Sequence, residues 1–452
     1  MSKDLLALAE SLSTSEPDEA LRIANGVLNA EPNNPRALFI AGFVMMKAER
    51  WGLAYNIFKR AIELAPSVDA CYNNAGMCAA SCTNADNNGM LDEAEKLLRK
   101  ALKLNKNSTA CRNNLALVGV HRCDPDMALR FAKDSLAINK DQPEAHESLG
   151  YAHLMRRNWA EGWDGYEKAI GWSKYRKDFQ YGNEHYWQGQ TGGRLIVRGE
   201  QGIGDEISFA SCIPDAVRDN KITFECDRRL EGLFRRSFPD VEVVGTRFDK
   251  EREWSKVRDW DYHCLVGTLA ARYRRTTESF PGTPYLVPDP ERRLQWRALL
   301  DTLPGRRVGL AWTGGLPNTF RYRRSFPLES LLPLLKTPGI TWVSMQYKDP
   351  TAEIEALEER HGIKIHHWAR ATESPDYDET AALAMELDQV VSTTTALVHL
   401  CGAIGQKCWV MVPKKPRWFY GLEGNTIPWY NSVSLYRQSD KWPVERIAAD
   451  LK

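Results

Sequence analysis

The stretch Leu195-Ile-Val-Arg-Gly-Glu-Gln-Gly-Ile-Gly-Asp-Glu-Ile-Ser-Phe-Ala210 decides how the chain around it folds. Its apolar start, Leu195 to Val197, predicts a buried strand; glycines then break the run, and apolar residues return at helical spacing. The pattern predicts a strand, a glycine turn and a helix that begins near Asp205. Such a turn leaves backbone N–H groups free at a helix start, beside the carboxyl end of a strand, where open α/β sheets bind ligands.

The residues of this turn allow two interpretations. Gly202 and Gly204 form the backbone turn, and Asp205 and Glu206 follow at its mouth. The acids are either an ordinary helix cap or carboxylates presented to a ligand. The turn is not the dinucleotide fingerprint, because Ile207 stands where the third glycine would fall.

The bulk composition is that of a globular protein. A length of 452 residues predicts two or three domains, and a net charge of +1 gives no general attraction to nucleic acid or membrane. The chain has no apolar run of membrane-spanning length, and its start does not resemble a signal peptide. Its 10 cysteines include no C-x-x-C pair, which predicts free thiols in a reducing compartment. We therefore expect a cytoplasmic protein with no membrane insertion.

The first third of the chain is an internal repeat. Small residues recur at steps of 34, 40, 34 and 34 residues, at Ala20, Ala54, Ala94, Ala128 and Gly162. The longer step implies an insert of six residues, which we place between Ser81 and Met90. The pattern resembles the tetratricopeptide repeat (TPR) over roughly residues 3–170, as about five helix pairs. It predicts an α-solenoid with a concave face, a surface typical of peptide binding.

The first helix of each pair also has a recurring small residue, at Gly42, Gly76, Ala116 and Gly150, and paired asparagines precede it on two of these helices. The asparagine pairs are Asn73 with Asn74, and Asn113 with Asn114. We expect Asn74 and Asn114 to line an acceptor groove, where side-chain amides could hold an extended peptide backbone. The alternative is that all four asparagines are simply solvated.

After Gly204 the chain alternates short apolar runs with helical stretches. Strands are predicted at 221–226, 241–244, 260–266, 307–312, 341–345, 363–366, 389–392 and 407–412. Helices are predicted at 229–238, 292–300, 328–335, 352–361, 380–387 and 396–404. Two such series predict two doubly wound α/β domains. Before them, aromatic residues concentrate between Arg157 and Trp187, which predicts a packed join to the repeat.

Residues 157–440 resemble a known family. The matching stretches are Arg198–Glu206, Val308–Gly314, Arg323–Pro327, Leu387–Ala403 and Pro428–Ser432. Together they resemble the glycosyltransferase half found fused to TPRs in bacteria. That half is related to the lipopolysaccharide heptosyltransferases and, more distantly, to the O-linked N-acetylglucosamine transferases.

The resemblance implies a GT-B fold, in which two Rossmann-like lobes face one another. The expected division is a TPR superhelix over 1–170, an acceptor-side lobe over 171–300 and a nucleotide-sugar lobe over 301–452. It implies metal-independent, inverting transfer from a nucleotide-sugar to a hydroxyl, with the nucleotide-sugar as co-substrate and no other cofactor. A protein or peptide recruited by the repeat is the expected acceptor.

The resemblance also assigns the reacting groups. The Asp after the glycine turn is the family's candidate general base, which here is Asp205, although adjacent Glu206 leaves the choice open. An acceptor hydroxyl must lose a proton as it attacks the anomeric carbon.

The donor-binding residues are expected in the second lobe. Thr393, Thr394 and Thr395 precede a helix start that suits a phosphate group, and Arg324 with Arg321 matches the basic position that meets the leaving phosphate. The family has Asp at the position of Thr394, so this chain departs there. The remaining predicted donor-lobe residues are His399, the cleft glycine Gly314, and Gln346 and Glu379, which could meet the base or the ribose.

Some interpretations remain open at this point. Asp124-Pro-Asp126, Asp259-Trp-Asp261 and Asp376-Tyr-Asp378 have the form of a manganese-binding triplet, but we expect no catalytic metal. Trp418, Trp429 and Tyr430 either close the cleft or belong to the core. The basic runs Arg272-Tyr-Arg-Arg275 and Lys414-Lys-Pro-Arg417 could meet the phosphates of a nucleic acid acceptor; a glycan or lipid acceptor is a further alternative. The last alternative is a non-catalytic peptide-binding scaffold with a degenerate GT-B domain.

Overall fold

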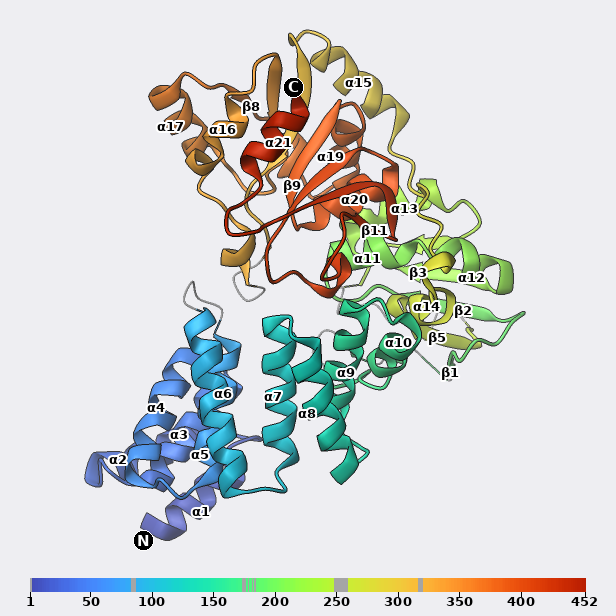
Figure 1. The fold of residues 1–452 in the computed structure, drawn as a ribbon. Coiled ribbons are helices and arrows are strands. Elements are labelled where there is room, and N and C mark those ends of the chain that lie inside the picture. The colour runs from blue at the N-terminus through green and yellow to red at the C-terminus, as the bar shows by residue number, and fades with distance from the viewer. Residues whose placement is uncertain are drawn as a thin grey trace. The chain divides into compact units, whose positions relative to one another are not determined.

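The computed structural model describes residues 2–82, 87–172, 176–177, 179–180, 182, 184–247, 259–315 and 320–452. The chain forms two compact units, Met1–His153 and Leu154–Lys452, whose elements are labelled in Figure 1. Within the described residues, no helix combines the length and apolar character needed to cross a bilayer.

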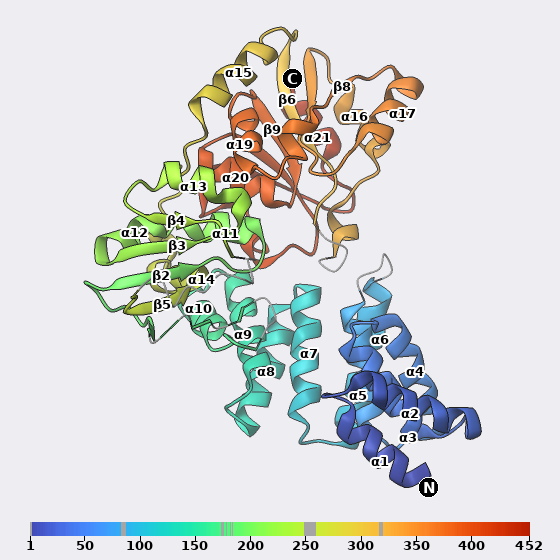
Figure 2. The same cartoon turned by 180° about the vertical axis from the view of Figure 1, so that it is seen from behind.

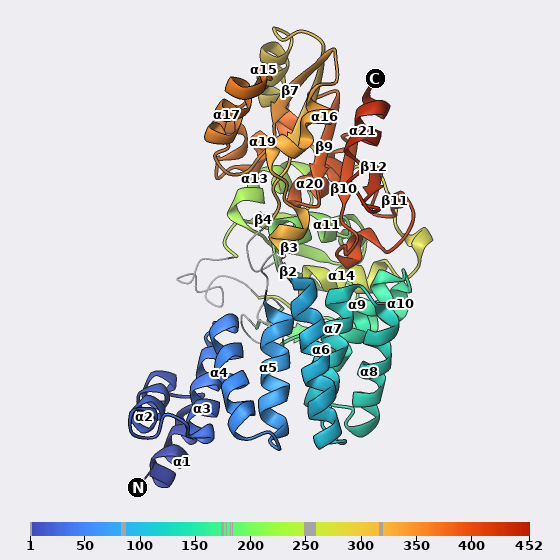
Figure 3. The same ribbon diagram turned by 60° about the vertical axis from the view of Figure 1, so that its left-hand side comes forward.

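The first unit is a helical solenoid, as the repeat predicts. Its helices are α1 (Ser2–Leu12), α2 (Pro17–Ala30), α3 (Pro35–Lys47), α4 (Trp51–Leu64), α5 (Asp69–Ser81), α6 (Asn87–Leu104), α7 (Thr109–Arg122), α8 (Pro125–Ile138) and the start of α9 (Pro143–Met155). Consecutive helices pack as pairs, and Figure 3 shows α4 to α8 standing side by side. Part of the predicted six-residue insert, residues 83–86, lies outside the described residues.

Small residues allow the paired helices to approach closely at the recurring residues Ala94 and Ala128. A methyl group on Gly76 would lie 2.6 Å from Leu98 Cγ, and one on Gly119 would lie 2.6 Å from the backbone nitrogen of Ala128. Both distances are shorter than van der Waals contact, so only glycine fits. The period of the sequence therefore records the points where α5 meets α6 and α7 meets α8.

The second unit begins with a parallel sheet. Its strands are β1 (His185–Tyr186), β2 (Arg194–Arg198), β3 (Lys221–Glu225), β4 (Glu242–Val244) and β5 (Tyr262–Leu265), in the order β1-β5-β2-β3-β4. The helices α11 (Ile203–Ala210), α12 (Ile213–Asp219), α13 (Glu231–Ser237) and α14 (Val266–Tyr273) pack around it (Figure 2). The chain moves outward from β2 to β4 and returns to the other side of β2 with β5, so the order reverses between β2 and β5.

A second, larger sheet follows. Its strands are β6 (Arg306–Ala311), β7 (Ile340–Ser344), β8 (Ile365–His366), β9 (Gln389–Thr393), β10 (Cys408–Val412), β11 (Thr426–Ile427) and β12 (Tyr430–Arg437). The order is β11-β12-β10-β9-β6-β7-β8, and all pairs are parallel except β11 with β12. Its helices are α15 (Pro290–Leu300), α16 (Leu332–Leu335), α17 (Thr351–His361), α18 (Ala369–Thr372), α19 (Tyr377–Met385), α20 (Ala396–Ile404) and α21 (Val444–Leu451). Here the order reverses between β6 and β9.

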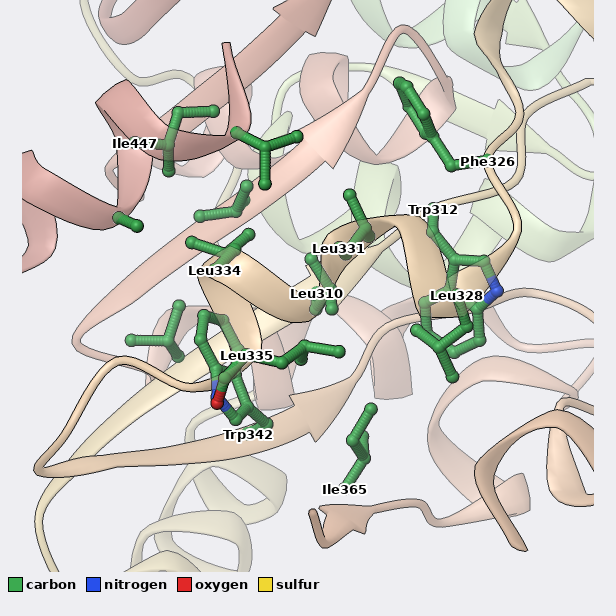
Figure 4. Close-up of a cluster of buried hydrophobic side chains, with 14 of the residues drawn as sticks. Leu310, Trp312, Phe326, Leu328, Leu331, Leu334, Leu335, Trp342, Ile365 and Ile447 are labelled. Carbon is green, nitrogen blue, oxygen red and sulfur yellow. The ribbon is translucent and has the colours of Figure 1, made fainter. Parts of the chain in front are cut away.

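One face of this larger sheet is covered by a continuous apolar core. Leu310 and Trp342 on the strands pack against Leu331 and Leu334, and Ile447 of α21 completes the cluster (Figure 4). All five side chains are buried. Burial of this kind stabilises a fold by roughly 1.5–3 kcal/mol for each large aliphatic side chain.

Contacts across the two sheets tie them into one unit. The backbone N–H groups of Tyr285 and Leu286 donate to the carbonyl of Ala403 at 2.9 and 3.0 Å, and the Tyr285 hydroxyl donates to the carbonyl of Ile207. Arg236 of α13 pairs with Asp378 of α19 at 2.7 Å. The first-sheet helices α11 and α13 are thus attached to the second-sheet helices α20 and α19.

The predicted strands and helices of the α/β region are confirmed, with bounds that differ by a few residues. Two predicted helices are shorter and begin with a 3₁₀ turn, at Arg228–Leu230 before α13 and at Leu328–Leu331 before α16. Helix α14 and strand β12 were not predicted. Trp429 and Tyr430 are buried, which makes them core residues and not lids over a cleft.

The aromatic residues of α10 (Trp159–Glu167) pack inside the second unit. The Trp163 indole donates to the Arg274 carbonyl at 2.8 Å, and the Trp159 ring lies 4.6 Å from that of Phe280. Trp159 and Trp163 therefore belong to the core of the second unit, whereas Trp172 is exposed; the predicted join to the repeat remains a prediction. The division at residues 170 and 300 remains a prediction.

Two glycine-to-alanine variants test the origin of the repeat pattern. Gly119→Ala should lower the free energy of unfolding by about 1–3 kcal/mol, because the new methyl group meets the backbone of Ala128. Gly26→Ala in α2 is the matched control: its methyl group meets nothing within 4 Å, so alanine should stabilise the helix by about 0.5–1 kcal/mol. Thermal unfolding followed by far-UV circular dichroism measures both, and equal effects would contradict this account.

Candidate functional site

The turn after β2 is held by buried charges. Glu200 accepts a hydrogen bond from the Gly267 N–H at 3.0 Å and pairs with Arg176 at 2.8 Å. Gln201 adopts a left-handed conformation with φ 60°, and its carbonyl accepts from Arg247. Because Gly267 follows β5, the Glu200 carboxylate joins the carboxyl ends of β2 and β5 where the strand order reverses.

Helices α11 and α20 meet at their starts. Each follows the central strand of its own sheet, β2 and β9 respectively. A methyl group on Gly204 would lie 3.2 Å from the Cα of Ala396 and from the Cδ2 of His399. The absence of a side chain at Gly204 therefore brings the carboxyl edges of the two sheets together.

Asp205 is the acidic residue that lies where α11 and α20 meet. It stands on the first turn of α11, is half-buried, and accepts a hydrogen bond from the Gly202 N–H at 3.2 Å. Burial raises the pKa of Asp205, while the positive charge of Arg417, the Gly202 N–H and the charge of Arg247 act in the opposite direction. A carboxylate whose pKa is raised accepts a proton more readily, which is what a general base requires.

Glu206 points elsewhere. Its side chain is fully buried, forms an ion pair with Arg247 and accepts a hydrogen bond from the Asp227 N–H at 2.9 Å. A methyl group on Gly199 would lie 2.5 Å from its carboxyl carbon. Glu206 thus anchors the end of β3 from inside, and of the two candidate bases Asp205 is the one with exposed surface.

The second sheet brings together three of the predicted donor segments. A methyl group on Gly314, after β6, would lie 2.9 Å from the Thr395 side chain. Arg324 donates to the carbonyl of Thr394 at 2.9 Å, and the Thr393 hydroxyl donates to the carbonyl of Arg324 at 2.9 Å. These segments converge where β6 and β9 reverse the strand order, the place where ligands bind to doubly wound sheets.

The polar groups of this cluster suit an anion. Arg324 is buried, and burial together with the charge of Arg417 lowers its pKa to about 10, so it remains a cation at neutral pH. Arg321 lies half-buried on the same 3₁₀ turn, Arg321–Arg324. Thr395 begins α20 without a side-chain capping bond, at the positive end of the helix dipole.

His399 is a neutral buried residue. Its Nδ1 lies 3.3 Å from the Tyr430 hydroxyl, and its ring packs against Phe419 with centroids 4.9 Å apart. Burial, aided by the charge of Arg417, lowers the pKa of His399 to about 3. It can shape the meeting of α11 and α20, but it cannot supply positive charge at neutral pH.

Gln346 and Glu379 have structural partners. The Gln346 side-chain oxygen accepts from the N–H groups of Trp312 and Thr313 at 3.2 and 3.1 Å, and Glu379 accepts from the Trp296 indole at 2.8 Å. Gln346 therefore holds the loop after β6, whereas Glu379 binds α15. Their predicted contacts with the base or ribose remain predictions.

The asparagines of the repeat unit are linked to one another. Asn114 donates to Asn73 at 2.9 Å, and Asn73 donates to Asn74 at 3.2 Å. The bond from Asn114 to Asn73 joins α7 to α5, while Asn113 donates to Gln142 at 3.0 Å. Asn74, Asn73 and Asn114 thus form an amide row, while Asn113 is bonded separately; Asn74 and Asn113 are buried, so these residues are not simply solvated.

The Asp-x-Asp triplets also serve the fold. Asp124 and Asp376 cap α8 and α19, Asp378 pairs with Arg236, and Asp259 and Asp261 pair with Arg194. A different group could hold a cation: Asp349, His367 and Glu373 place ligand atoms within 4.8 Å of one another. It is partly exposed, and Asp349 already binds the N–H and hydroxyl of Thr351.

Arg417 is the site residue that the sequence did not assign. It lies on the loop after β10, its side chain is exposed, and its charge acts on Asp205, Arg324 and His399. The sequence feature that points to Arg417 is the basic run Lys414-Lys-Pro-Arg417, whose expected partners are the phosphates of a nucleic acid acceptor. The other basic run has partners: Arg274 pairs with Asp215, and Arg275 pairs with Asp164.

Comparison with known proteins finds similarity over most of the chain. No family model matches. Protein FlbA of Caulobacter vibrioides is 29% identical over 433 residues, covering 90% of this chain and 70% of FlbA. Among solved structures, the TPR protein TTC0263 of Thermus thermophilus is 22% identical, covering 37% of this chain and 90% of its own, with a TM-score of 0.34. YrrB, a TPR protein with an unusual peptide-binding site, is 20% identical, covering 37% of this chain and 83% of its own, with a TM-score of 0.30.

Variants that remove one negative charge should show that Asp205 and Glu206 affect stability differently. Glu206→Gln leaves buried Arg247 without its counter-charge and should lower the free energy of unfolding by about 3 kcal/mol. Asp205→Asn should not lower it. Because the folded-state pKa of Asp205 is raised, its ionisation disfavours folding as pH rises through that pKa, so Asp205→Asn should gain stability over wild type at higher pH. Urea unfolding at several pH values measures both, and the reverse order would contradict these roles.

Proposed function

We propose that this protein is a metal-independent, inverting glycosyltransferase that moves a sugar from a nucleotide-sugar to a hydroxyl group of a protein acceptor. The observation that carries the proposal is the meeting of α11 and α20, each at the strand-order reversal of a parallel sheet. On one side stands an acid with a raised pKa, Asp205, and on the other a buried cation, Arg324. The resemblance to the GT-B glycosyltransferases implies two facing lobes, and this meeting of the helices supports the proposal.

The second lobe would bind the donor through its phosphate. The N–H groups at the start of α20, the Thr395 hydroxyl and the Arg324 guanidinium all favour an anion at one place. Thr394 replaces the Asp of the family, so no carboxylate at that position repels a phosphate.

Asp205 would take the proton of the acceptor hydroxyl. As that proton leaves, the acceptor oxygen forms a bond to the anomeric carbon, and the bond from this carbon to the phosphate oxygen breaks. The released electron pair stays on the phosphate, where Arg324 stabilises the added negative charge. One displacement inverts the anomeric centre and needs no covalent intermediate on the protein.

The repeat unit would supply acceptor recognition. Its amide row, from Asn74 through Asn73 to Asn114, offers donors and acceptors of the kind that an extended peptide backbone needs. Because these amides already hold one another in place, a peptide would meet a surface ordered in advance.

A second candidate function is a peptide-binding scaffold without catalysis, which the Thr394 departure favours. Nucleotide binding separates the two. We would measure the melting temperature with UDP, GDP, ADP, CMP and dTDP in the presence of a chelator. The transferase should respond to one of them, with about 2.7 kcal/mol of added stability at 100 times its dissociation constant. No response to any nucleotide would favour the scaffold.

Two variants assign the roles within the cleft. Arg324→Ala should abolish the nucleotide-induced shift in melting temperature. Asp205→Asn should retain that shift but lose transfer by about 10²–10⁴-fold, because only the proton acceptor is removed. Transfer of labelled sugar from the nucleotide-sugar identified by melting is the measurement. An active Asp205→Asn variant would rule out Asp205 as the base.

The amide row is tested by the double variant Asn74→Ala/Asn114→Ala. It should reduce transfer of labelled sugar to proteins of the producing cell about tenfold, the equivalent of about 1.4 kcal/mol of acceptor binding. Hydrolysis of the nucleotide-sugar without acceptor should not change. Asn107→Ala, at an exposed position in the loop before α7, is the matched control. Equal transfer by both variants would remove the row from acceptor binding.

A further inference from the structure

Packing places the loop that carries Arg417 against α11 and α20. Arg417 directly precedes the 3₁₀ turn Trp418–Tyr420, whose three side chains are buried. The Phe419 ring lies 4.9 Å from His399 of α20 and 5.9 Å from Phe209 of α11, measured between centroids. The loop after β10 therefore enters the space where α11 and α20 meet.

Further bonds hold this loop in place. The Trp418 and Trp163 rings lie 5.6 Å apart, and the side chain of Arg437 donates to the carbonyls of Tyr420 and Gly421. Arg417 is thus an exposed residue on an anchored backbone, directly before a turn that packs against α11 and α20.

The charges around Arg417 are unbalanced. Lys414, three residues earlier, pairs with Asp440 at 3.0 Å, whereas in the described part of the chain no ion pair is formed by Arg417. Its charge opposes that of Arg324, which donates to the Thr394 carbonyl just before α20. Two guanidinium groups that repel one another are stabilised by an anion placed between them.

We propose that Arg417 is the second cation of the donor site and binds the phosphate of the nucleotide opposite Arg324. This inference rests on the proposed function and extends it, because it assigns a residue of the loop after β10 to the leaving group. As the bond from the anomeric carbon to the phosphate oxygen breaks, the electron pair passes to an oxygen held by both arginines.

The same position gives Arg417 a second effect. Its charge is the strongest of the influences that lower the pKa of Asp205 against burial. With Arg417 present, the carboxylate remains ionised, and ready to take a proton, at a lower pH than it otherwise would. Arg417 therefore links donor binding to the protonation of the candidate base.

The binding test compares Arg417→Gln with Lys414→Gln, an exposed residue of the same loop that already pairs with Asp440. Isothermal titration with UDP, GDP, ADP, CMP and dTDP gives the affinities. Arg417→Gln should weaken the nucleotide that wild type binds by tenfold or more, Arg417→Lys by less, and Lys414→Gln by less than twofold. The CMP arm separates a monophosphate from the diphosphates as the group that is bound.

The outcomes separate the two proposals. If wild type binds one of the nucleotides and Arg417→Gln binds it equally well, the role of Arg417 is overturned while the transferase proposal stands. If wild type binds none of them, both are overturned. Arg417→Gln removes both the repulsion from Arg324 and the attraction to Asp205, so its melting temperature should stay close to that of wild type, and weaker binding would not reflect misfolding.

The pH dependence of transfer is the second readout. Removing Arg417 raises the pKa of Asp205, so the acid limb of kcat/KM for Arg417→Gln should move to higher pH than in wild type. A purely structural role for Arg417 would lower the rate without moving the limb. An unchanged limb would overturn the link between Arg417 and the base.

Discussion

The contact between the starts of α11 and α20 is the constraint on which the site depends, and Gly204, where a methyl group would lie 3.2 Å from the Ala396 Cα, makes it close. Any side chain there would meet the Ala396 backbone. The turn before Gly204 is fixed just as firmly, because Glu200 holds Arg176 and the Gly267 N–H at once. A buried ion pair adds little net stability when its desolvation is counted, but removing one partner is costly. This pair therefore specifies the conformation of the turn more than it stabilises the fold.

Burial then shifts the pKa values of the ionisable groups that lie near this contact. Withdrawal from water raises the pKa of Asp205, lowers that of Arg324 and keeps His399 neutral. All three shifts disfavour charge, so the ionised groups of the cleft oppose folding. Such pKa shifts are common at sites that bind or transform ligands, where reactive groups lower the stability of the fold.

Much of the fold could be predicted from local patterns, and the departures have identifiable causes. Helix α20 was predicted at its observed bounds, since Thr395 and Gly405 mark its ends and its apolar run is continuous. The choice between Asp205 and Glu206 stayed open, although Glu206 is three and four residues before buried Phe209 and Ala210 and so shares their helix face. Arg417 could not be assigned, because its place depends on Phe419 packing against helices distant in sequence. Hydrogen bonding within the asparagine row is likewise a long-range property that no local pattern contains.

The close contact at Gly204 also affects the entropy and the rate of ligand binding. Two lobes joined by a flexible hinge lose conformational entropy when a ligand closes them. Here Gly204 against Ala396, and Tyr285 against Ile207 and Ala403, already set the separation of the two sheet edges. The ordering entropy is lost when the chain folds, before any ligand arrives. We expect ligand binding at such a site to bury little apolar protein surface, so the heat-capacity change of binding should be small. The association rate should then be set by encounter and not by a rearrangement of the lobes.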